Sequence, residues 1–225
     1  MPRIIVPTRV YTDQRLTDHD LVVYAGAQYY RPLRDLETGE IPLLGQSLVY
    51  TMYGTFDLAS ATRRMITSSL DHLIELGVIL GSQLNHGRYL ITSFTNENVG
   101  QGDRFAVIDF EELLIILRSS YKNKYALFRF LCLVIGSIGY KTKVGDASSE
   151  YFAQELSVTT ITISHYMKAL VNMGIIYTKI KPVGTEDGVR RWRYYGRAKD
   201  AALVDKEARY CGRKASADQN AANLF

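Results

Sequence analysis

The chain has 225 residues, of which 47% are hydrophobic and 22% charged, a balance that excludes a disordered protein. It has only two cysteines, which argues against a disulfide framework or a zinc site and favours a reducing, cytoplasmic location. The longest apolar segment, YALFRFLCLVIGSIGY, is interrupted by Arg129 and is too short to cross a bilayer. We therefore expect a core helix there and no membrane partner.

The net charge of +4 is distributed unevenly along the sequence. Residues 176–214 contain eleven Lys or Arg and five Asp or Glu, so this stretch carries +6 and the remainder carries −2. Trp192, Tyr194 and Tyr195 are interleaved with these charges. The pattern indicates that an anionic partner is met in the C-terminal third, with a simple solvated basic surface as the alternative.

The first half predicts helices followed by a hairpin. Thr17 is a candidate N-cap for a helix in LTDHDLVVYAGAQYY, and a short extended piece is expected around Ile41. The segment QSLVYTMYG predicts a short helix that ends at Gly54. A long helix over about 61–76 ends at Gly77, where a left-handed residue is favourable. The segments VILGSQL and RYLITSF then predict two strands around the tight turn NHG.

The second half predicts a similar series. Asp109 can cap a helix in DFEELLIILRSS, and a buried helix is expected over 128–138. The segment SSEYFAQELSV predicts a short helix that begins at Ser148 or Ser149, and a long helix is expected over 160–173. The segments IIYTKIKPVG and VRRWRYYG then predict a second hairpin, with the longer loop GTEDG.

These elements predict an α+β fold that is mainly α. We expect an N-terminal domain over 1–94, a polar linker over 95–104 and a C-terminal domain over 105–196. The remaining residues, 197–225, are expected to form a helical or disordered tail, because AKDAALVDKEARYC has helical character whereas the last residues have little to bury.

The two halves share one apolar pattern. An offset of 97 places Gly77 over Gly174, and it aligns four further pairs: Leu73 with Leu170, Leu70 with Met167, Ile66 with Ile163, and Thr62 with Thr159. The polar positions of the two segments differ. A repeat that keeps its inward face and varies its outward face suggests two copies of one module that read different surfaces.

The order helix, short helix, turn, long helix and hairpin resembles the winged helix-turn-helix. The segment LSVTTITISHYMKALVNMGII in particular resembles the recognition helix of bacterial winged-helix DNA-binding proteins. Two such domains in tandem, over roughly residues 15–195, resemble the replication initiators of bacterial plasmids. The first copy also resembles the N-terminal domains of phage and Gram-positive replication organisers. This resemblance implies sequence-specific binding of double-stranded DNA.

A recognition helix packs one stripe on its own domain and presents the opposite stripe to the major groove. In the second copy we expect the inward stripe to be Ile163, Tyr166, Met167 and Leu170. The expected DNA-contacting residues are then Thr159, Thr160, Ile161, Ser164, His165 and Lys168.

These outward residues suit different parts of a duplex. The two threonines lie where hydroxyls and backbone amides at a helix N-terminus can meet a phosphate. Ser164 and His165 can donate to base edges, and Ile161 can contact a thymine methyl group. Lys168 can neutralise a phosphate one turn further on. The alternative for His165 is a solvent-facing residue without a ligand.

The second hairpin adds five candidate DNA contacts: Lys179, Lys181, Arg190, Arg191 and Arg193. Alternation along a strand places the two lysines on one face, and Arg191 with Arg193 on one face. Each phosphate that such a ribbon neutralises steepens the salt dependence of binding by about one unit. Trp192 alternates with these arginines and is expected to point inward, into the core.

In the first copy the candidate DNA contacts are Arg63, Arg64, Thr67 and Ser68. A guanidinium can bond guanine or phosphate bidentately, and the alternative for the two arginines is an ion pair with Asp57 or Glu75. Asp71 occupies the position of Lys168 and would repel the DNA backbone. We therefore expect the second copy to be the stronger DNA reader and leave open that the first is a dimerisation or protein-contact module.

No pattern for catalysis, metal binding or cofactor binding is found. The sequence has no glycine-rich loop ending in Lys-Ser or Lys-Thr, and its four histidines are scattered without metal-ligand spacing. A tyrosine nucleophile for strand cleavage would require a histidine cluster nearby, which the chain lacks. We expect a protein that is not an enzyme, with no cofactor and no metal.

Three functions fit this pattern. The first is initiation of replication for a plasmid or phage-like element by binding double-stranded DNA. The second is transcriptional repression, which the same residues serve equally well. The third is a replication or partition adaptor that binds replication proteins, and in each case a homodimer through the N-terminal winged helix is a further expected partner.

Overall fold

The computed structural model describes residues 2–56, 59–85, 87–98, 104–185 and 188–209; side chains are described for all of these except 98, 183–185 and 188–191. The fold is α+β with more residues in helices than in strands, as expected, and the sheets in these ranges are small and antiparallel. The described helices include none that is long and apolar enough to cross a membrane. The chain divides into two compact units, unit 1 (Met1–Gly136) and unit 2 (Ser137–Phe225).

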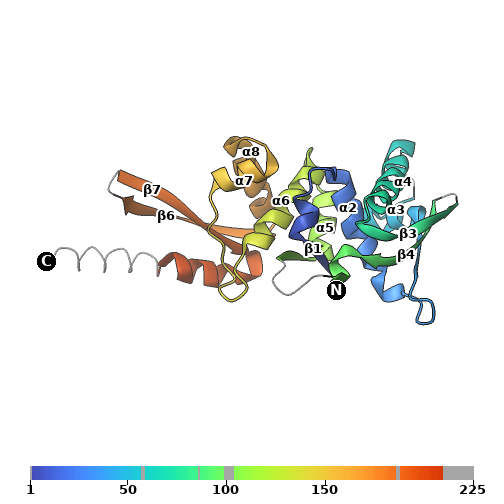
Figure 1. Cartoon of the computed structure of the whole chain (residues 1–225). Helices are drawn as coiled ribbons and strands as arrows, with labels where there is room; N and C mark the ends of the chain where they lie inside the picture. The colour runs from blue at the N-terminus through green and yellow to red at the C-terminus, as the bar shows by residue number, and fades with distance from the viewer. Residues whose placement is uncertain (1, 57–58, 86, 99–103, 186–187, 210–225) are drawn as a thin grey trace. The chain divides into compact units, whose positions relative to one another are not determined.

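Unit 1 contains a three-stranded sheet covered by helices (Figure 1). Its α-helices are α1 (Thr8–Tyr11), α2 (Asp18–Ala27), α3 (Gly45–Tyr53), α4 (Ser60–Glu75), α5 (Phe110–Arg118) and α6 (Lys124–Ser137), the last of which reaches the unit boundary. Its 3-10 helices are η1 (Gln28–Leu33) and η2 (Thr95–Asn98). Its strands are β1 (Arg3–Pro7), β2 (Ile41–Leu44), β3 (Ile79–Asn85), β4 (Arg88–Phe94) and β5 (Phe105–Asp109). The three-stranded sheet has the order β2-β4-β3, and β1 pairs with β5 separately.

Local signals place the helices of unit 1 as predicted. Thr17 caps α2: its hydroxyl accepts from the Asp20 N–H at 3.2 Å, and the Asp20 carboxylate accepts from the Thr17 N–H at 2.8 Å. Gly54 and Gly77 follow α3 and α4 in the left-handed region, with φ of +73° and +67°. Asp109 precedes α5, as predicted, and its N–H donates to Glu112 at 2.9 Å.

Unit 1 extends further along the chain than the predicted domain boundaries. β5 pairs with β1 over its whole length, so the predicted C-terminal domain over 105–196 does not begin as a separate body. The guanidinium of Arg129 in α6 donates to the Asp18 carboxylate at 2.5 Å and to two main-chain carbonyls of unit 1 at 3.0 and 2.6 Å. The division therefore follows Gly136 instead of falling in the expected linker over 95–104, of which only a part is described.

The described part of unit 2 contains a short helix, a longer helix, a two-stranded ribbon and a C-terminal helix. The elements are α7 (Ser149–Leu156), α8 (Thr160–Asn172), β6 (Ile176–Thr185), β7 (Gly188–Arg197), η3 (Ala198–Asp200) and a helix over 201–209. We call β6 and β7 together the ribbon. The predicted cap of α7 is confirmed, because the Ser148 hydroxyl accepts from the Tyr151 N–H at 3.1 Å.

The ribbon is longer than the sequence predicted. Pairing continues until Thr185 lies opposite Gly188, so most of the segment GTEDG, expected as a loop, belongs to the strands. On its other side β7 pairs briefly with Gly145, which exchanges two main-chain hydrogen bonds with Tyr195 at 2.8 and 2.9 Å. Residues 201–209 form the helix expected after Gly196, and the rest of the predicted tail lies outside the described residues.

The predicted repeat extends to the main-chain hydrogen bonds at the ends of α4 and α8. In unit 1 the N–H of Val78 donates to the Leu73 carbonyl at 2.9 Å. In unit 2 the N–H of Ile175, 97 positions later, donates to the Leu170 carbonyl at 3.1 Å. Gly174, like Gly77, is left-handed, with φ of +70°. The two helices therefore end in the same geometry.

Each hairpin returns to the end of the helix that precedes it. The Thr95 N–H donates to the Val78 carbonyl at 3.1 Å, and the Ala198 N–H donates to the Ile175 carbonyl at 3.0 Å. The order of elements along the chain is also the same: helix, strand or bridge, helix, helix and hairpin. The first series is α2, β2, α3, α4, β3 and β4, and the second is α6, the bridge at Gly145, α7, α8, β6 and β7.

Candidate nucleic-acid interface

The outward face of α8 is accessible along its whole length. The exposed side chains are Thr160, Ile161, Ser164, His165 and Lys168, and Ile161 is 68% exposed. The opposite stripe is buried, as predicted: Ile163, Tyr166, Met167 and Leu170. The orientation predicted for this helix is therefore confirmed, and its polar face lies where a ligand can reach it.

The Thr159 hydroxyl is hydrogen-bonded within the first turn of α8. Its hydroxyl accepts from the Thr162 N–H at 3.2 Å and lies 3.0 Å from the Thr162 hydroxyl. We predicted a direct phosphate contact for this hydroxyl, but it forms the N-cap instead. The cap fixes the first turn of α8, whose remaining backbone N–H groups are suited to an anion.

A tight turn sets α8 against α7. Ser157 adopts the left-handed conformation with φ of +52°, and the Val158 N–H donates back to the Ala153 carbonyl at 3.0 Å. Phe152 and Ala153 on α7 are buried. This short turn is what gives α8 a fixed orientation in unit 2.

The ribbon has two faces of different chemistry. Ile180 lies directly opposite Arg193 in register, so the two residues share one face, which we call the front face. Lys179 and Lys181 flank Ile180 and point to the rear face, because successive side chains of a strand alternate. The cations of the ribbon are therefore not gathered on one surface.

The rear face is covered by the helix over 201–209, drawn in red in Figure 1. The Lys179 ammonium lies 3.7 Å from the Asp205 carboxylate, and the Lys181 ammonium donates to the Ala208 carbonyl at 2.8 Å. Both lysines were predicted to contact DNA. The structure instead engages them with the C-terminal helix of the same unit.

The aromatic residues of β7 also differ from expectation. Trp192 was predicted to be core but is 41% exposed, whereas Tyr194 and Tyr195 are buried. The Tyr195 hydroxyl lies 2.8 Å from the Ser137 hydroxyl and accepts from the Ala147 N–H at 3.1 Å. Burial raises the pKa of Tyr195 to about 12, so this hydroxyl stays neutral and bonded at physiological pH.

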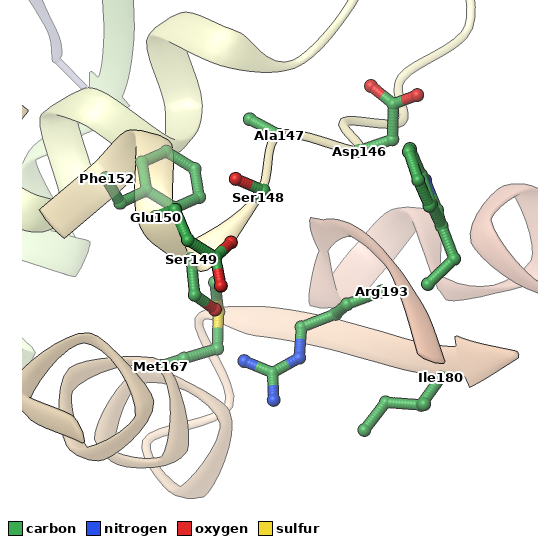
Figure 2. A pocket seen from close by; sticks show the side chains of 10 residues that line it. Asp146, Ala147, Ser148, Ser149, Glu150, Phe152, Met167, Ile180 and Arg193 are labelled. Carbon is green, nitrogen blue, oxygen red and sulfur yellow. The ribbon is translucent and has the colours of Figure 1, made fainter. Parts of the chain in front are cut away.

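A groove opens between the ribbon and the start of α7; the ribbon contributes Ile180 and Arg193 from its front face and Trp192, which lies opposite Lys181. Its volume is about 760 Å³, and its lining residues are Asp146, Ala147, Ser148, Ser149, Glu150, Phe152, Met167, Ile180, Trp192 and Arg193. Figure 2 shows the Arg193 side chain reaching from the ribbon toward Met167 and Glu150. From α8 only Met167, a residue of its buried stripe, lines this groove.

The charges at this groove are of both signs. Asp146 and Glu150 lie at the α7 side and Arg193 at the ribbon side. The pKa of Glu150 is lowered by hydrogen bonds from its own N–H and from the Ser148 hydroxyl, so it is an anion at neutral pH. Arg193 makes no ion pair with the carboxylates of the described residues. The side chains of Arg190 and Arg191, also predicted to contact DNA, lie outside the described ones.

In unit 1 the face of α4 is only partly as predicted. Arg63, Arg64 and Ser68 are exposed. Thr67, a predicted DNA contact, turns back on its own unit: its hydroxyl donates to the Arg64 carbonyl at 3.0 Å, and its methyl group lies beside Gly87. Three of the four predicted side chains of this copy therefore remain available to a ligand.

Asp71 has a partner within unit 1, and the ion pair with Glu75 that was the alternative for the two arginines is not formed among the described side chains. The Tyr89 hydroxyl donates to Asp71 at 2.9 Å, and burial together with this carboxylate raises the pKa of Tyr89. Asp71 thus anchors the hairpin of unit 1. Within the described residues neither arginine pairs with Glu75, and Asp57 lies outside them.

A buried carboxylate links α2 to α4 away from this surface. Asp20 is 2% exposed, and its Oδ2 lies 3.0 Å from His72 Nδ1. Burial raises the pKa of Asp20, but hydrogen bonds from Ser69, Thr17 and His72 outweigh it and hold the pKa below its usual value. This pair is structural. A search of the described residues finds no group of three or more His, Cys, Asp or Glu that could hold a metal ion.

Sequence reasoning missed the groove and the role of the C-terminal helix. A usable signal was present: Val204 and Ala208 are spaced by four residues, which places them on one side of a helix. In the structure both are buried with Tyr194 in a small apolar cluster behind the ribbon. An apolar stripe in the predicted tail could therefore have indicated that it packs on a strand of its own unit.

No protein-family model matches the chain, and the search of curated proteins finds no match either.

Proposed function

We propose that the chain binds double-stranded DNA through two winged helices in tandem. The observation that carries the proposal is α8: a polar outward stripe with Lys168, held on a buried stripe, beside a ribbon whose front face presents Arg193. A helix of this kind fits the width of a major groove, while a two-stranded ribbon at its side can follow the phosphate backbone.

The scaffold supports the same proposal in both halves. The series helix, strand, helix, helix and hairpin occurs twice, and the β2-β4-β3 order places the short strand next to the second strand of the hairpin. In the second half Gly145 lies next to β7 in the same way. This order supports the proposal of a winged helix, with α4 and α8 as the helices that would read DNA.

We further propose that unit 2 is the main reader and that the protein initiates replication of a plasmid or phage-like element in the cytoplasm, without enzymatic activity of its own. The outward faces of α4 and α8 differ from each other, which suits a composite or repeated DNA site. Duplexes selected from a random-sequence library would give the recognised site. Repeats of that site within a replication origin support initiation, whereas a single site overlapping a promoter supports repression.

Three variants test DNA binding by unit 2. Lys168→Ala and Arg193→Ala each remove a cation from the proposed interface, so each is expected to weaken binding and to reduce the slope of log K against log salt by about 0.9. Lys179→Ala is the matched control, because this lysine lies on the rear face of the same ribbon, near Asp205. Fluorescence anisotropy with the selected duplex over a range of salt concentrations gives both quantities.

The outcomes separate the proposal from its alternatives. Unchanged affinity in both Lys168→Ala and Arg193→Ala at low salt would contradict DNA binding by this surface and favour a protein-contact module. An equal loss in Lys179→Ala would show that only the overall charge matters and that the assignment of the two ribbon faces is wrong.

A further inference from the structure

We propose that the edge of β7 that faces away from β6, which we call the open edge, is a docking site for an extended acidic peptide of a partner protein. The peptide adds to the ribbon as a third strand. This inference goes beyond DNA binding and does not depend on it. Three features of the described residues lead to it: the third strand of unit 1, the direction of the main-chain groups of β7 and the charge of the ribbon.

Unit 1 shows which position of unit 2 is vacant. Ile91 in β4 pairs with β3 on one side and with Ile41 of β2 on the other. Tyr195 in β7 pairs with β6 on one side and with Gly145 on the other. The β3 partner of Ile91 and the β6 partner of Tyr195 are 97 positions apart, which is the offset of the repeat. Ile41 and Gly145 therefore occupy equivalent positions.

Pairing continues past this position in unit 1 only. Three further residues of β2, ending with Leu44 opposite Arg88, extend the third strand. In unit 2 the chain turns away after Gly145 and begins α7, and within the described residues β7 has no further strand partner on this side. The positions beside Arg193 and Trp192 therefore lack the strand that unit 1 has there.

The groove of unit 2 lies at this vacancy. Arg193 shares a face of the ribbon with Ile180, and Trp192 shares the opposite face with Lys181. Both Arg193 and Trp192 line the groove, so it is bordered by side chains from the two faces of β7 and lies at the edge of this strand. In Figure 2 the segment that leads into α7 lies across the groove from Arg193.

The main chain of β7 is oriented for the addition of a strand. Gly145 and Tyr195 exchange two main-chain hydrogen bonds at 2.8 and 2.9 Å, so the N–H and C=O groups of Tyr195 point away from β6. These groups alternate in direction along a strand, and the register of β7 is continuous, so those of Arg193 and of residue 191 also point away from β6. The open edge therefore presents donors and acceptors that an extended peptide can pair with.

The charge of the ribbon favours an acidic occupant. β6 and β7 together contain six Lys or Arg and no Asp or Glu. Arg193 makes no ion pair with the carboxylates of the described residues. Glu150, on the other side of the groove, already accepts from its own N–H and from the Ser148 hydroxyl. An acidic side chain placed opposite Arg193 therefore gains a cross-strand ion pair without displacing an existing one.

The two faces of β7 predict the side-chain pattern of the peptide. A residue opposite Arg193 shares the front face and is expected to be acidic, whereas its neighbour lies opposite Trp192 on the rear face. Trp192 is 41% exposed, so a β-branched residue there covers its ring. A second copy of β7 suits the open edge less well, because it would bring two arginine-rich strands side by side, and like charges across a pair are destabilising.

The single tryptophan of the chain, Trp192, reports on the open edge. The probe is a capped synthetic peptide in which three valines alternate with two glutamates between Ser-Gly and Gly-Ser ends. It is added to the full chain in the absence of DNA while Trp192 emission is recorded. The expected result is a saturable shift to shorter wavelength. The matched control has the same residues with the two glutamates adjacent, and loss of the shift is expected because the alternation is broken.

N-methylation of the peptide tests whether its main chain carries the binding. The main-chain groups of Arg193 face the open edge, so the residue opposite it in an antiparallel pair exchanges both hydrogen bonds with it. Methyl groups on the two glutamate nitrogens are therefore expected to abolish the shift. Methyl groups on two valine nitrogens, which point away from β7, are expected to preserve it.

A charge exchange tests the acidic preference. Arg193→Glu is expected to weaken binding of the glutamate peptide by about fivefold and to favour the same peptide with lysine in place of glutamate. Binding of the lysine peptide also shows that the variant is folded. Lys179→Ala is the control, because this lysine lies on the rear face near Asp205, and it is expected to bind the glutamate peptide as the unaltered chain does.

The other outcomes overturn the proposal. Absence of a shift with the glutamate peptide, or an equal effect of the two methylation patterns, would contradict strand addition at the open edge. Unchanged preference for the glutamate peptide in Arg193→Glu would contradict the acidic partner. Trp192 emission that changes on dilution of the chain alone would assign the edge to a second copy, and a shift with duplex DNA but with neither peptide would assign it to nucleic acid.

Discussion

The hairpins of unit 1 and unit 2 follow helices that end in the same geometry, α4 and α8, but they are held differently. In unit 1 the Gly45 N–H donates to the Gly87 carbonyl at the hairpin turn at 2.9 Å, and Tyr89 donates to Asp71 on α4. In unit 2 the ribbon is held from behind by the helix over 201–209, and its front face stays open. The comparison shows that the two copies differ in how their hairpins are tied, while the helices that carry them are alike.

The two units also differ in the short strand that pairs with the hairpin. β2 pairs with β4 over four residues, from Ile41 opposite Ile91 to Leu44 opposite Arg88, so the sheet of unit 1 has three strands. In unit 2 the equivalent contact is the single bridge at Gly145. The ribbon of unit 2 is therefore less constrained by a neighbouring strand and depends on the C-terminal helix.

The largest expected effect tests whether the two copies are separate folding units. Leu73→Ala and Leu170→Ala remove equivalent, fully buried side chains, and each is expected to destabilise its own unit by about 3 kcal/mol. Calorimetry should show one transition moving in each variant and the other unchanged. The exposed control Ser68→Ala is expected to change stability by less than about 0.5 kcal/mol. Movement of both transitions together would show a single cooperative unit.

An intermediate effect concerns the buried carboxylate of unit 1. Asp20→Asn keeps the shape but loses the charge that faces His72, and it is expected to destabilise unit 1 by about 2 kcal/mol near neutral pH. Because the folded-state pKa of Asp20 is depressed, its contribution to stability is present above the unfolded value of 3.8 and is lost as the pH falls through the lower folded value.

Urea unfolding at about pH 7 and about pH 3 measures this contribution. The unaltered unit 1 should lose more stability between these conditions than Asp20→Asn does. The exposed control Glu75→Gln should resemble the unaltered chain. The described residues of unit 2 include no carboxylate buried to this degree, so its transition should not respond to the substitution. The same acid sensitivity in Asp20→Asn would contradict the assignment.

The smallest expected effect asks whether unit 1 also contacts DNA. Arg63→Ala combined with Arg64→Ala should reduce the salt slope by less than Lys168→Ala combined with Arg193→Ala, for which about 1.8 is expected. Arg15→Ala, an arginine of unit 1 bound to Asp13 at 2.7 Å, is the control. An equal or larger change in the first pair would reverse the ranking of the two units.

The helices could be predicted because their signals are local. A cap such as Thr17 and a left-handed glycine such as Gly77 act within one turn of the helix they limit, so the sequence around them is sufficient. The buried stripe of α8 followed from helical spacing in the same way. Helix positions therefore agreed closely with expectation.

The unit boundary and the ribbon could not be predicted, because they depend on distant partners. β1 and β5 lie about a hundred residues apart in the sequence, as do Arg129 and Asp18. The residues around each of them do not indicate which distant segment is its partner. Alternation correctly separates Lys179 from Ile180 but cannot say which face is covered. Trp192 was therefore assigned to the core, whereas it is 41% exposed.

The hydrogen bonds that close each hairpin at the helix end have a consequence for how such a protein can vary. A main-chain hydrogen bond joins Val78 to Thr95 in unit 1 and Ile175 to Ala198 in unit 2. The two ends of each hairpin are therefore fixed next to each other at the end of a helix. Insertions or deletions there, made two residues at a time, preserve which side chains face which way. Each hairpin can thus be lengthened or shortened toward a ligand while the helix before it keeps its position.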